Sequence, residues 1–145
     1  EESLFTEYIV RNGQRPDQIS YEIYGDEQFY WVILQINEIT DFYNQWPLSQ
    51  MELAEFIANK YGSDLASSQI HHWETVETYD DDTPPNLVLP GGLVVPATFK
   101  YEYPQIPGET TYETSFPISV TNQQYEERLN DAKSAIFILP IRLVD

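Results

Sequence analysis

The chain has 145 residues, of which 24 are acidic and 7 are basic, so its formal net charge is −17. This charge repels phosphate backbones and anionic lipid surfaces, which excludes nucleic acid and membrane as direct partners. The chain has no cysteine, which excludes a disulfide framework and a thiolate metal site. No run reaches the roughly 20 apolar residues of a membrane span. We therefore expect a soluble protein made in a reducing cytoplasm.

The first predicted helix covers Pro16 to Tyr24. Pro16 has no N–H to leave unsatisfied and suits the first helical turn, and Asp17 complements the positive end of the helix dipole. Gly25 can adopt the left-handed conformation that commonly ends a helix. These signals together predict a helix of about two turns.

The second predicted helix is apolar on all sides. Seven of the eight residues from Phe29 to Ile36 are apolar or aromatic, and Asp26 can accept hydrogen bonds from the free N–H groups of the first turn. A buried strand is the alternative, but the cap before the run and Asn37 after it favour a helix. A helix that is apolar on every side must be covered on every side. We therefore expect Trp31 to lie in the core.

The third predicted helix, Gln50 to Tyr61, has the clearest local signals. Ser49 and Glu52 form a capping box before it, and Gly62 provides the stop. The link that precedes this helix carries three aromatic residues: Phe42, Tyr43 and Trp46. Each of them could lie either in the core or at an interface with a partner.

These segments resemble a known family. The run RPDQISYEIYGDEQFYWVILQIN, followed by the Trp-Pro link and by LSQMELAEFIANKYG, is similar to the baseplate wedge protein 53 family of contractile-tailed bacteriophages. In that family a similar RP, IYG, YWV and N series belongs to the part related to the LysM fold, a compact βααβ module. The resemblance implies that Glu7 to Arg11, before the Asn12-Gly13 turn, is the first strand. Near the other end, Ser119 to Pro140 is similar to the family's closing segment.

The resemblance implies a structural subunit of the tail baseplate wedge that bridges neighbouring wedge proteins, without catalysis and without a cofactor. Its partners would be other baseplate wedge proteins and neighbouring wedges, with multiple copies in a symmetric particle. It would be located in the virion, at the tail baseplate, after synthesis in the host bacterial cytoplasm. The alternative function is a LysM-type carbohydrate-binding module, because LysM folds commonly bind peptidoglycan or chitin glycans.

The middle of the chain differs from both ends. Ile70 to Tyr79 and Thr98 to Tyr103 are dense in β-branched and aromatic residues with partial alternation, which predicts strands. Between them, prolines and glycines interrupt the apolar pieces of DDDTPPNLVLPGGLVVP. We expect an extended, hairpin-like arm with few residues available to bury its own apolar side chains.

Near the end, Thr121 and Gln124 make a second capping box, which predicts a helix from Asn122 to Ser134. Strands are predicted on either side, at Ile118 to Val120 and Ala135 to Leu139. The helix is expected to turn an apolar stripe inward (Tyr125, Leu129, Ala132 and Ile136) and a charged face to solvent (Glu126, Glu127, Arg128, Asp131 and Lys133). The apolar tail packs on its own domain or docks on a partner, and we favour the partner.

These elements predict an α+β protein in three parts. Residues 1–62 would form the LysM-like βααβ module, residues 63–115 the extended β-rich arm, and residues 116–145 a C-terminal strand-helix-strand segment used for docking. Residues 1–62 are expected to fold without the tail, because the three helices carry their own caps.

No catalytic, cofactor or metal site is predicted. Neighbours on a strand point to opposite faces, so His71 and His72 are expected to be structural rather than ligands of one ion. Asp80 to Asp82 precede Thr-Pro-Pro rather than a glycine-centred loop, which indicates a solvated turn rather than a calcium site. On the tail strand, one face is expected to meet a partner (Phe137 and Leu139) and the other to pack on the preceding helix (Ile136 and Ile138). The candidate partner-interface residues are Phe42, Tyr43, Trp46, Phe137, Leu139 and Ile141.

Overall fold

The computed structural model describes residues 4–106, 108 and 110–140. The chain forms two compact units: unit 1 holds the residues up to Lys60 and those from Glu126 onward, and unit 2 holds Tyr61 to Tyr125. Both units contain helices and strands, so the predicted α+β class is confirmed. None of the helices in the described part of the chain has both the length and the apolar composition that a membrane span requires. The three sequence segments, 1–62, 63–115 and 116–145, stay a prediction.

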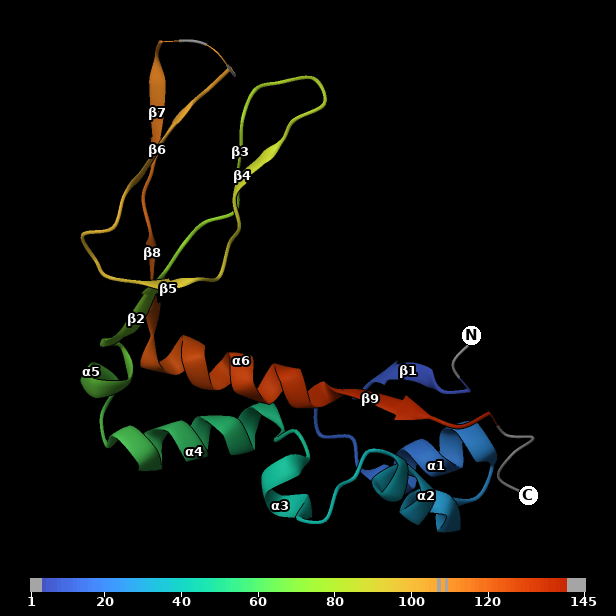
Figure 1. Cartoon of the computed structure of the whole chain (residues 1–145). Helices are drawn as coiled ribbons and strands as arrows, with labels where there is room; N and C mark the ends of the chain where they lie inside the picture. The colour runs from blue at the N-terminus through green and yellow to red at the C-terminus, as the bar shows by residue number, and fades with distance from the viewer. Residues whose placement is uncertain (1–3, 107, 109, 141–145) are drawn as a thin grey trace. The chain divides into compact units, whose positions relative to one another are not determined.

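Unit 1 combines helices with one pair of strands (Figure 1). Its elements in chain order are β1 (Thr6–Ile9), α1 (Pro16–Tyr24), a 3-10 turn (Glu27–Phe29), α2 (Tyr30–Ile36), α3 (Phe42–Gln45), α4 (Gln50–Tyr61), the greater part of α6 (Asn122–Ser134) and β9 (Ala135–Ile138). Helices α1, α4 and α6 have the bounds that their capping signals predict.

Helix α1 begins and ends on local signals. The backbone N–H of Arg15 donates to Oε1 of Gln18 at 2.8 Å, which satisfies a group just outside the first turn. At the other end Gly25 takes a φ of 76° and donates its N–H to the carbonyl of Tyr21 at 2.9 Å. A left-handed φ of this kind costs glycine nothing, whereas a side chain would be strained there.

The second helix is confirmed, but its predicted complete burial is wrong. The side chain of Asp26 accepts the N–H of Gln28 at 2.9 Å, and a short 3-10 turn leads into α2. Ile33 is fully buried, whereas Trp31 is 54% exposed. With only seven residues, α2 packs on α1 and β9 along one side, so a ring on its opposite side stays uncovered.

Strand β1 pairs in antiparallel fashion with β9, the last strand among the described residues, so that Thr6 lies opposite Ile138 and Ile9 opposite Ala135. Helices α1 and α2 cover one side of this pair (Figure 1). The core between them contains Val10, Ile19, Tyr24, Ile33, Trp46, Ile136 and Ile138. The arrangement is therefore β-α-α-β, with the closing strand supplied by the end of the chain. Its relation to the LysM fold stays a prediction.

This core bears on two expectations about the tail. Ile136 and Ile138 are 3% and 9% exposed, and they pack with Ile19 of α1 and Ile33 of α2 rather than with the preceding helix. Strand β9 also completes both the sheet and the core of residues 1–62, so we now expect these residues to need the tail in order to fold. Helix caps act only locally and supply no core packing.

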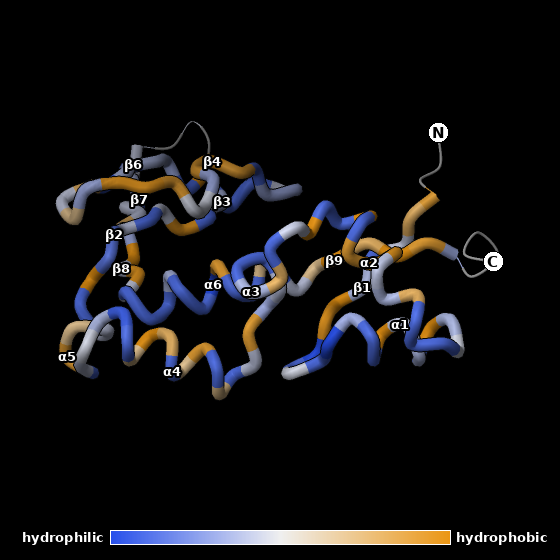
Figure 2. The backbone as a smooth tube through the Cα atoms, turned by 90° about the horizontal axis from the view of Figure 1, so that it is seen from below, coloured by the Kyte–Doolittle hydropathy of each residue, from blue (hydrophilic) through white to orange (hydrophobic). Residues whose placement is uncertain are grey.

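Helix α6 turns a polar face inward, contrary to the expected apolar stripe. Glu126, expected in solvent, is 4% exposed and accepts a 2.6 Å bond from Nζ of Lys60, whereas Leu129 is 44% exposed. One turn further on, the carboxamide of Asn130 pairs with both backbone groups of Leu48, at 2.7 and 3.0 Å. The helix is mainly hydrophilic along its length (Figure 2). The inward side chains of α6 are thus polar groups with hydrogen-bond partners, and these bonds offset the cost of removing the groups from water.

Unit 2 is built almost entirely from short strands. Its elements are α5 (Asp64–Ser67), β2 (Ile70–Glu74), β3 (Thr78–Tyr79), β4 (Leu87–Leu89), β5 (Val94–Val95), β6 (Tyr101–Pro104), β7 (Tyr112–Ser115), β8 (Ile118–Thr121) and the first turn of α6. They form a three-stranded sheet in the order β5-β2-β8 and the hairpins β3-β4 and β6-β7. The strand predicted over residues 70–79 is thus divided in two, and that predicted over 98–103 begins only at Tyr101.

Candidate docking surfaces

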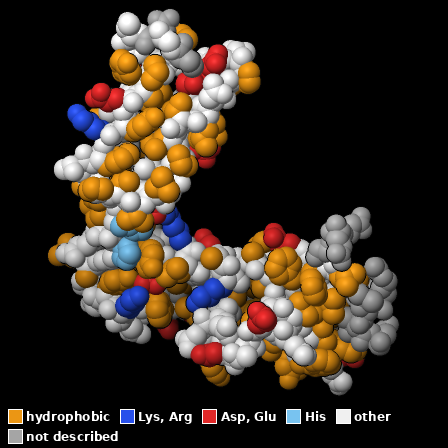
Figure 3. All heavy atoms as spheres, in the orientation of Figure 1, with side chains coloured by type: hydrophobic (Ala, Val, Ile, Leu, Met, Phe, Trp, Pro, Cys, Tyr) orange, Lys and Arg blue, Asp and Glu red, His pale blue; other side chains and the backbone are white. Residues whose placement is uncertain are grey.

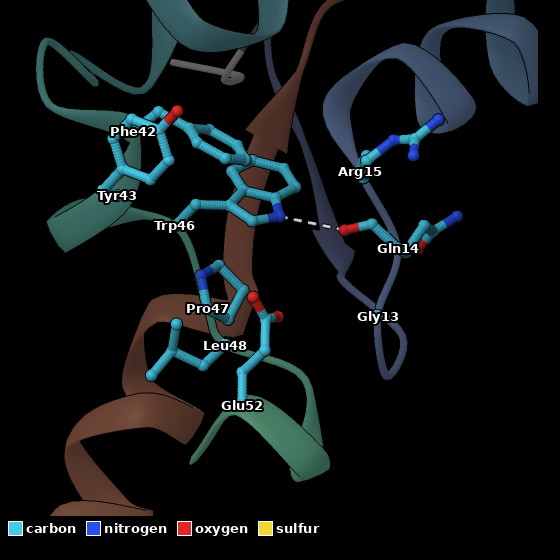
Figure 4. Close-up of a pocket in the computed structure, with 9 residues that line it drawn as sticks. All are labelled: Gly13, Gln14, Arg15, Phe42, Tyr43, Trp46, Pro47, Leu48 and Glu52. Carbon is cyan, nitrogen blue, oxygen red and sulfur yellow. Dashed lines mark hydrogen bonds between the residues drawn. The ribbon is translucent and has the colours of Figure 1, made fainter. Parts of the chain in front are cut away.

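The link between α2 and α4 places three aromatic residues in different environments. Trp46 is 4% exposed, and its indole Nε1–H donates to the carbonyl of Gln14 at 2.9 Å (Figure 4). The ring of Phe42 stacks on this indole, with centroids 6.0 Å apart and an interplanar angle of 20°. Tyr43 is 85% exposed and meets Phe42 edge-on. Trp46 is therefore a core residue that supports the two more exposed rings.

These rings line one side of a pocket of about 210 Å³ (Figure 4). The tight turn at Gly13 and the first turn of α4 provide its other sides. Its lining residues are Gly13, Gln14, Arg15, Phe42, Tyr43, Trp46, Pro47, Leu48 and Glu52. The pocket combines apolar and polar groups, as small binding sites in proteins commonly do.

A second pocket of about 340 Å³ shares Arg15 and Phe42 with the first. Its wall is largely apolar, with Tyr30 and Leu34 of α2 on one side. Arg15 lies 3.2 Å from Asp17, and the hydrogen bond from its guanidinium lowers the pKa of that carboxyl. An ion pair and several aromatic side chains therefore border the same surface of unit 1.

The outward face of the β1–β9 pair is a second candidate surface. Phe137 is 49% exposed, and its ring lies 6.4 Å from that of Phe5, which is 43% exposed. Ile9 lies on the same face and is 57% exposed. Leu139 is half-buried, and its carbonyl accepts the hydroxyl of Tyr24 at 2.8 Å. Ile141, the remaining candidate, lies outside the described residues.

Unit 2 exposes many apolar side chains and buries few. Of the described part of this unit, only Leu89 and Val120 are buried hydrophobic residues, and Figure 3 shows hydrophobic side chains gathered over its strands. Twelve large hydrophobic side chains are exposed: Leu65, Ile70, Val76, Tyr79, Leu87, Leu93, Val94, Tyr101, Ile106, Tyr112, Phe116 and Ile118. Apolar surface of this extent commonly marks an interaction site.

The histidine pair is arranged differently from the prediction. A register shift in β2 between Ile70 and His72 brings Nδ1 of His71 to 2.8 Å from Nδ1 of His72, so the two rings do not point to opposite faces. Nε2 of His72 lies 2.5 Å from Glu74, and the ring of His71 stacks on Tyr125 at 3.9 Å. Among the described residues, no group of three or more His, Asp or Glu side chains is placed to hold a metal ion.

Asp80 was predicted to lie in a solvated turn, but its side chain is buried, with 5% exposed. Its carboxylate accepts the backbone N–H groups of Asn86 and Asp82 at 2.9 and 3.1 Å. The bond from Asn86 is the main cause of a lowered pKa for this carboxyl. Asp80 thus closes the turn between β3 and β4 rather than facing a ligand.

Sequence reasoning identified two of these surfaces only in part. The outer face of β1 could have been found from the alternation of its residues, because Phe5, just before the strand, and Ile9, at its end, lie an even number of positions apart. For unit 2 the sequence predicted an arm with few residues to bury its apolar side chains. It did not predict which of these side chains are exposed, since burial there depends on contacts between short strands far apart in the sequence.

Comparison with known proteins gives matches to phage baseplate proteins. Residues 3–82 match the family described as base plate wedge protein 53, which is more than half of the chain. A stretch of 65 residues is 31% identical to the baseplate wedge protein gp53 of Enterobacteria phage T4. That match covers 45% of this chain and 33% of the T4 protein, so the chain spans about a third of that relative's length. The family match includes every residue that lines the two pockets.

Proposed function

Because the chain belongs to the base plate wedge protein 53 family, we propose that it is a structural subunit of a phage tail baseplate wedge. In this role it bridges neighbouring wedge proteins during baseplate assembly, as multiple copies in a symmetric virion particle. It is made in the host bacterial cytoplasm before it joins the tail. The proposed role needs neither a catalytic step nor a cofactor.

The observation that carries this proposal is the apolar surface of unit 2. In its described part, twelve large hydrophobic side chains are exposed and two are buried. A soluble monomer rarely exposes large contiguous apolar patches, and such surfaces commonly serve protein association. The acidic surface of the chain limits self-association and favours partners with basic surfaces.

Unit 1 supplies a separate surface, which is what a bridging subunit requires. Phe42 and Tyr43 are exposed beside the two pockets, and Trp46 below them holds the ring of Phe42 in a stack. Rigid aromatic side chains of this kind often anchor protein interfaces. We assign the two units to different partners in the wedge.

Reconstitution tests this role. The chain is mixed with the other wedge proteins of its phage, and complex formation is followed by sedimentation. We expect the double substitution Leu87→Asp and Phe116→Asp in unit 2 to prevent incorporation, because it places charges on the exposed apolar surface. The control, Thr110→Asp with Thr111→Asp, adds the same two charges at exposed polar positions and should incorporate normally.

The alternative function, a LysM-type carbohydrate-binding module, has one supporting feature. The pocket beside Tyr43 combines exposed aromatic rings with polar groups of Gln14 and Glu52. Titration with peptidoglycan fragments and chitin oligomers separates the two functions. A structural subunit gives no saturable heat, whereas micromolar binding, about −8 kcal/mol, together with failure to join wedge proteins, would establish the alternative.

A further inference from the structure

The two edges of the β1–β9 pair are not equivalent. At the β9 edge, the side chain of Asn37 occupies the place of a neighbouring strand. Its Oδ1 accepts the N–H of Phe137 at 2.8 Å, and its Nδ2 donates to the carbonyl of Phe137 at 2.8 Å. Both outward backbone groups of the middle of β9 are therefore satisfied within unit 1.

The β1 edge is open. Val10 donates its N–H to the carbonyl of Ser134, and backbone groups alternate in direction along a strand, so the groups of Tyr8 point toward β9 and those of Glu7 and Ile9 point away. Across the part of the chain that the structure describes, these outward groups of Glu7 and Ile9 have no hydrogen-bond partner. A row of unpaired backbone groups is a template for another strand.

The side chains beside this edge define what could pair with it. Glu7 lies directly opposite Phe137, on the outward face of the pair, and Phe5 and Ile9 occupy the same face two residues away on either side. A strand added at this edge would therefore have one residue beside the carboxylate of Glu7. Its residues two positions before and after would lie beside the apolar side chains of Phe5 and Ile9. Opposite charges and apolar pairs stabilise neighbouring strands.

We propose that the edge of β1 receives an extended segment of another wedge protein as a third strand, with a basic side chain beside Glu7 and apolar side chains two residues to either side. This inference rests on the proposed function. A second copy of this chain is a poorer occupant, because pairing two β1 strands brings two copies of Glu7 together and the chain already carries a net charge of −17.

Hydrogen exchange with single-residue resolution tests the pairing, because alternate amides report on different edges. In the free protein, the outward amides of Glu7 and Ile9 should exchange quickly, and those of Tyr8 and Val10 slowly. In the assembled wedge, the exchange of Glu7 and Ile9 should slow to the level of Tyr8 and Val10.

Incorporation without this change would overturn the inference and leave the proposed function standing, whereas failure to incorporate would overturn both. Protection of Glu7 and Ile9 already in the free protein would show that the edge is filled by this chain itself and would also overturn the inference.

A matched pair of variants gives a second measurement. Glu7→Pro removes an outward N–H but no bond between β1 and β9, and Glu7→Ala removes the carboxylate but keeps the N–H. Glu7→Pro should weaken wedge assembly by about tenfold or more, and Glu7→Ala by a smaller factor. Unfolding of the free chain shows whether either variant disturbs unit 1. Equal assembly of Glu7→Pro and the unsubstituted chain, with unit 1 intact, would rule out backbone pairing at this edge.

Discussion

Asn37 illustrates how much one side chain contributes when it replaces a secondary-structure element. Its carboxamide makes both backbone hydrogen bonds that a neighbouring strand would make to Phe137, and it also donates to the carbonyl of Ile33 at the end of α2. The residue thereby ties the helix to the last strand. A hydrophobic or shorter side chain at this position would leave the N–H and the carbonyl of Phe137 to be satisfied by water, whereas the carbonyl of Ile33 would still accept the backbone N–H of residue 37.

Replacement of Asn37 by alanine is expected to lower the free energy of unfolding of unit 1 by about 1–2 kcal/mol, because the lost hydrogen bonds are only partly replaced by water. Urea denaturation followed by tryptophan fluorescence measures the change. Asn44→Ala is the matched control, since Asn44 is exposed and bonds only to the nearby Asp41 within the described residues. The control should change the free energy by less than about 0.5 kcal/mol, and an equal loss in both variants would contradict the role of Asn37.

Asp80 gives a prediction about pH. Hydrogen bonds, chiefly from the backbone of Asn86, lower its pKa in the folded protein. The stabilising contribution of the carboxylate is therefore fully present above the unfolded pKa of about 3.9 and is lost as the pH falls through the lower folded pKa. An NMR titration of the Asn86 amide should show a midpoint below about 3.9, and Asp80→Asn should abolish it. A midpoint at or above 3.9 would refute the prediction, and Glu113→Gln controls for the change in net charge.

At the scale of elements, local chemistry and long-range pairing differ in how well the sequence predicts them. The bounds of α1, α4 and α6 were predicted because proline, glycine and capping boxes act within one turn. The pairing of β1 with β9 was not, because it joins opposite ends of the chain and leaves no local signal. The inward face of α6 was missed for a related reason: Glu126 is buried only because Lys60 of another helix lies beside it.

Among the candidate docking residues, too, local patterns predicted the environment of some side chains and long-range contacts decided that of others. Alternation along the last strand predicted that Phe137 would lie on the outward face and Ile138 on the inward face, and the structure places them there. The sequence could not distinguish the environments of Trp46 and Tyr43, because the difference depends on a hydrogen bond from the indole to the distant carbonyl of Gln14. Their roles in partner binding remain proposals.

The last strand is expected to be necessary for the fold of unit 1. Ile136→Ala should lower the free energy of unfolding by about 2–4 kcal/mol, since the side chain lies in the core with α1 and α2. Phe137→Ala, one residue along and half exposed, should cost less than about 1 kcal/mol. A chain ended after Ser134 should lose the cooperative unfolding of unit 1, and a chain ended after Pro140 should keep it. Cooperative unfolding of the shorter chain would show that residues 1–62 fold alone.

At the scale of the whole molecule, the two units differ in the kind of stabilisation they have. Unit 1 has one core cluster of seven buried hydrophobic residues. They come from α1, α2, β9, the residue after β1 and the residue after α3. The described part of unit 2 buries two hydrophobic residues, and much of its remaining buried set is polar, including Thr75, Asp80 and Ser115. A segment with so little apolar burial is held mainly by short strand pairs and turns, which open easily.

Unit 2 should therefore gain much of its rigidity on assembly. In the free chain, the amides of residues 87–95 should exchange hydrogen quickly, because β4 and β5 have only three and two residues and Leu89 alone among these five is buried. In the wedge, contact with a partner should slow this exchange by at least about tenfold, about 1.4 kcal/mol in the free energy of opening. The amides of Ile19 and Ile33 serve as the internal control, because both residues are fully buried in unit 1 and should exchange slowly in either state. Strong and equal protection of residues 87–95 in the free and assembled protein would show that unit 2 is rigid by itself, and its apolar surface would then need another explanation.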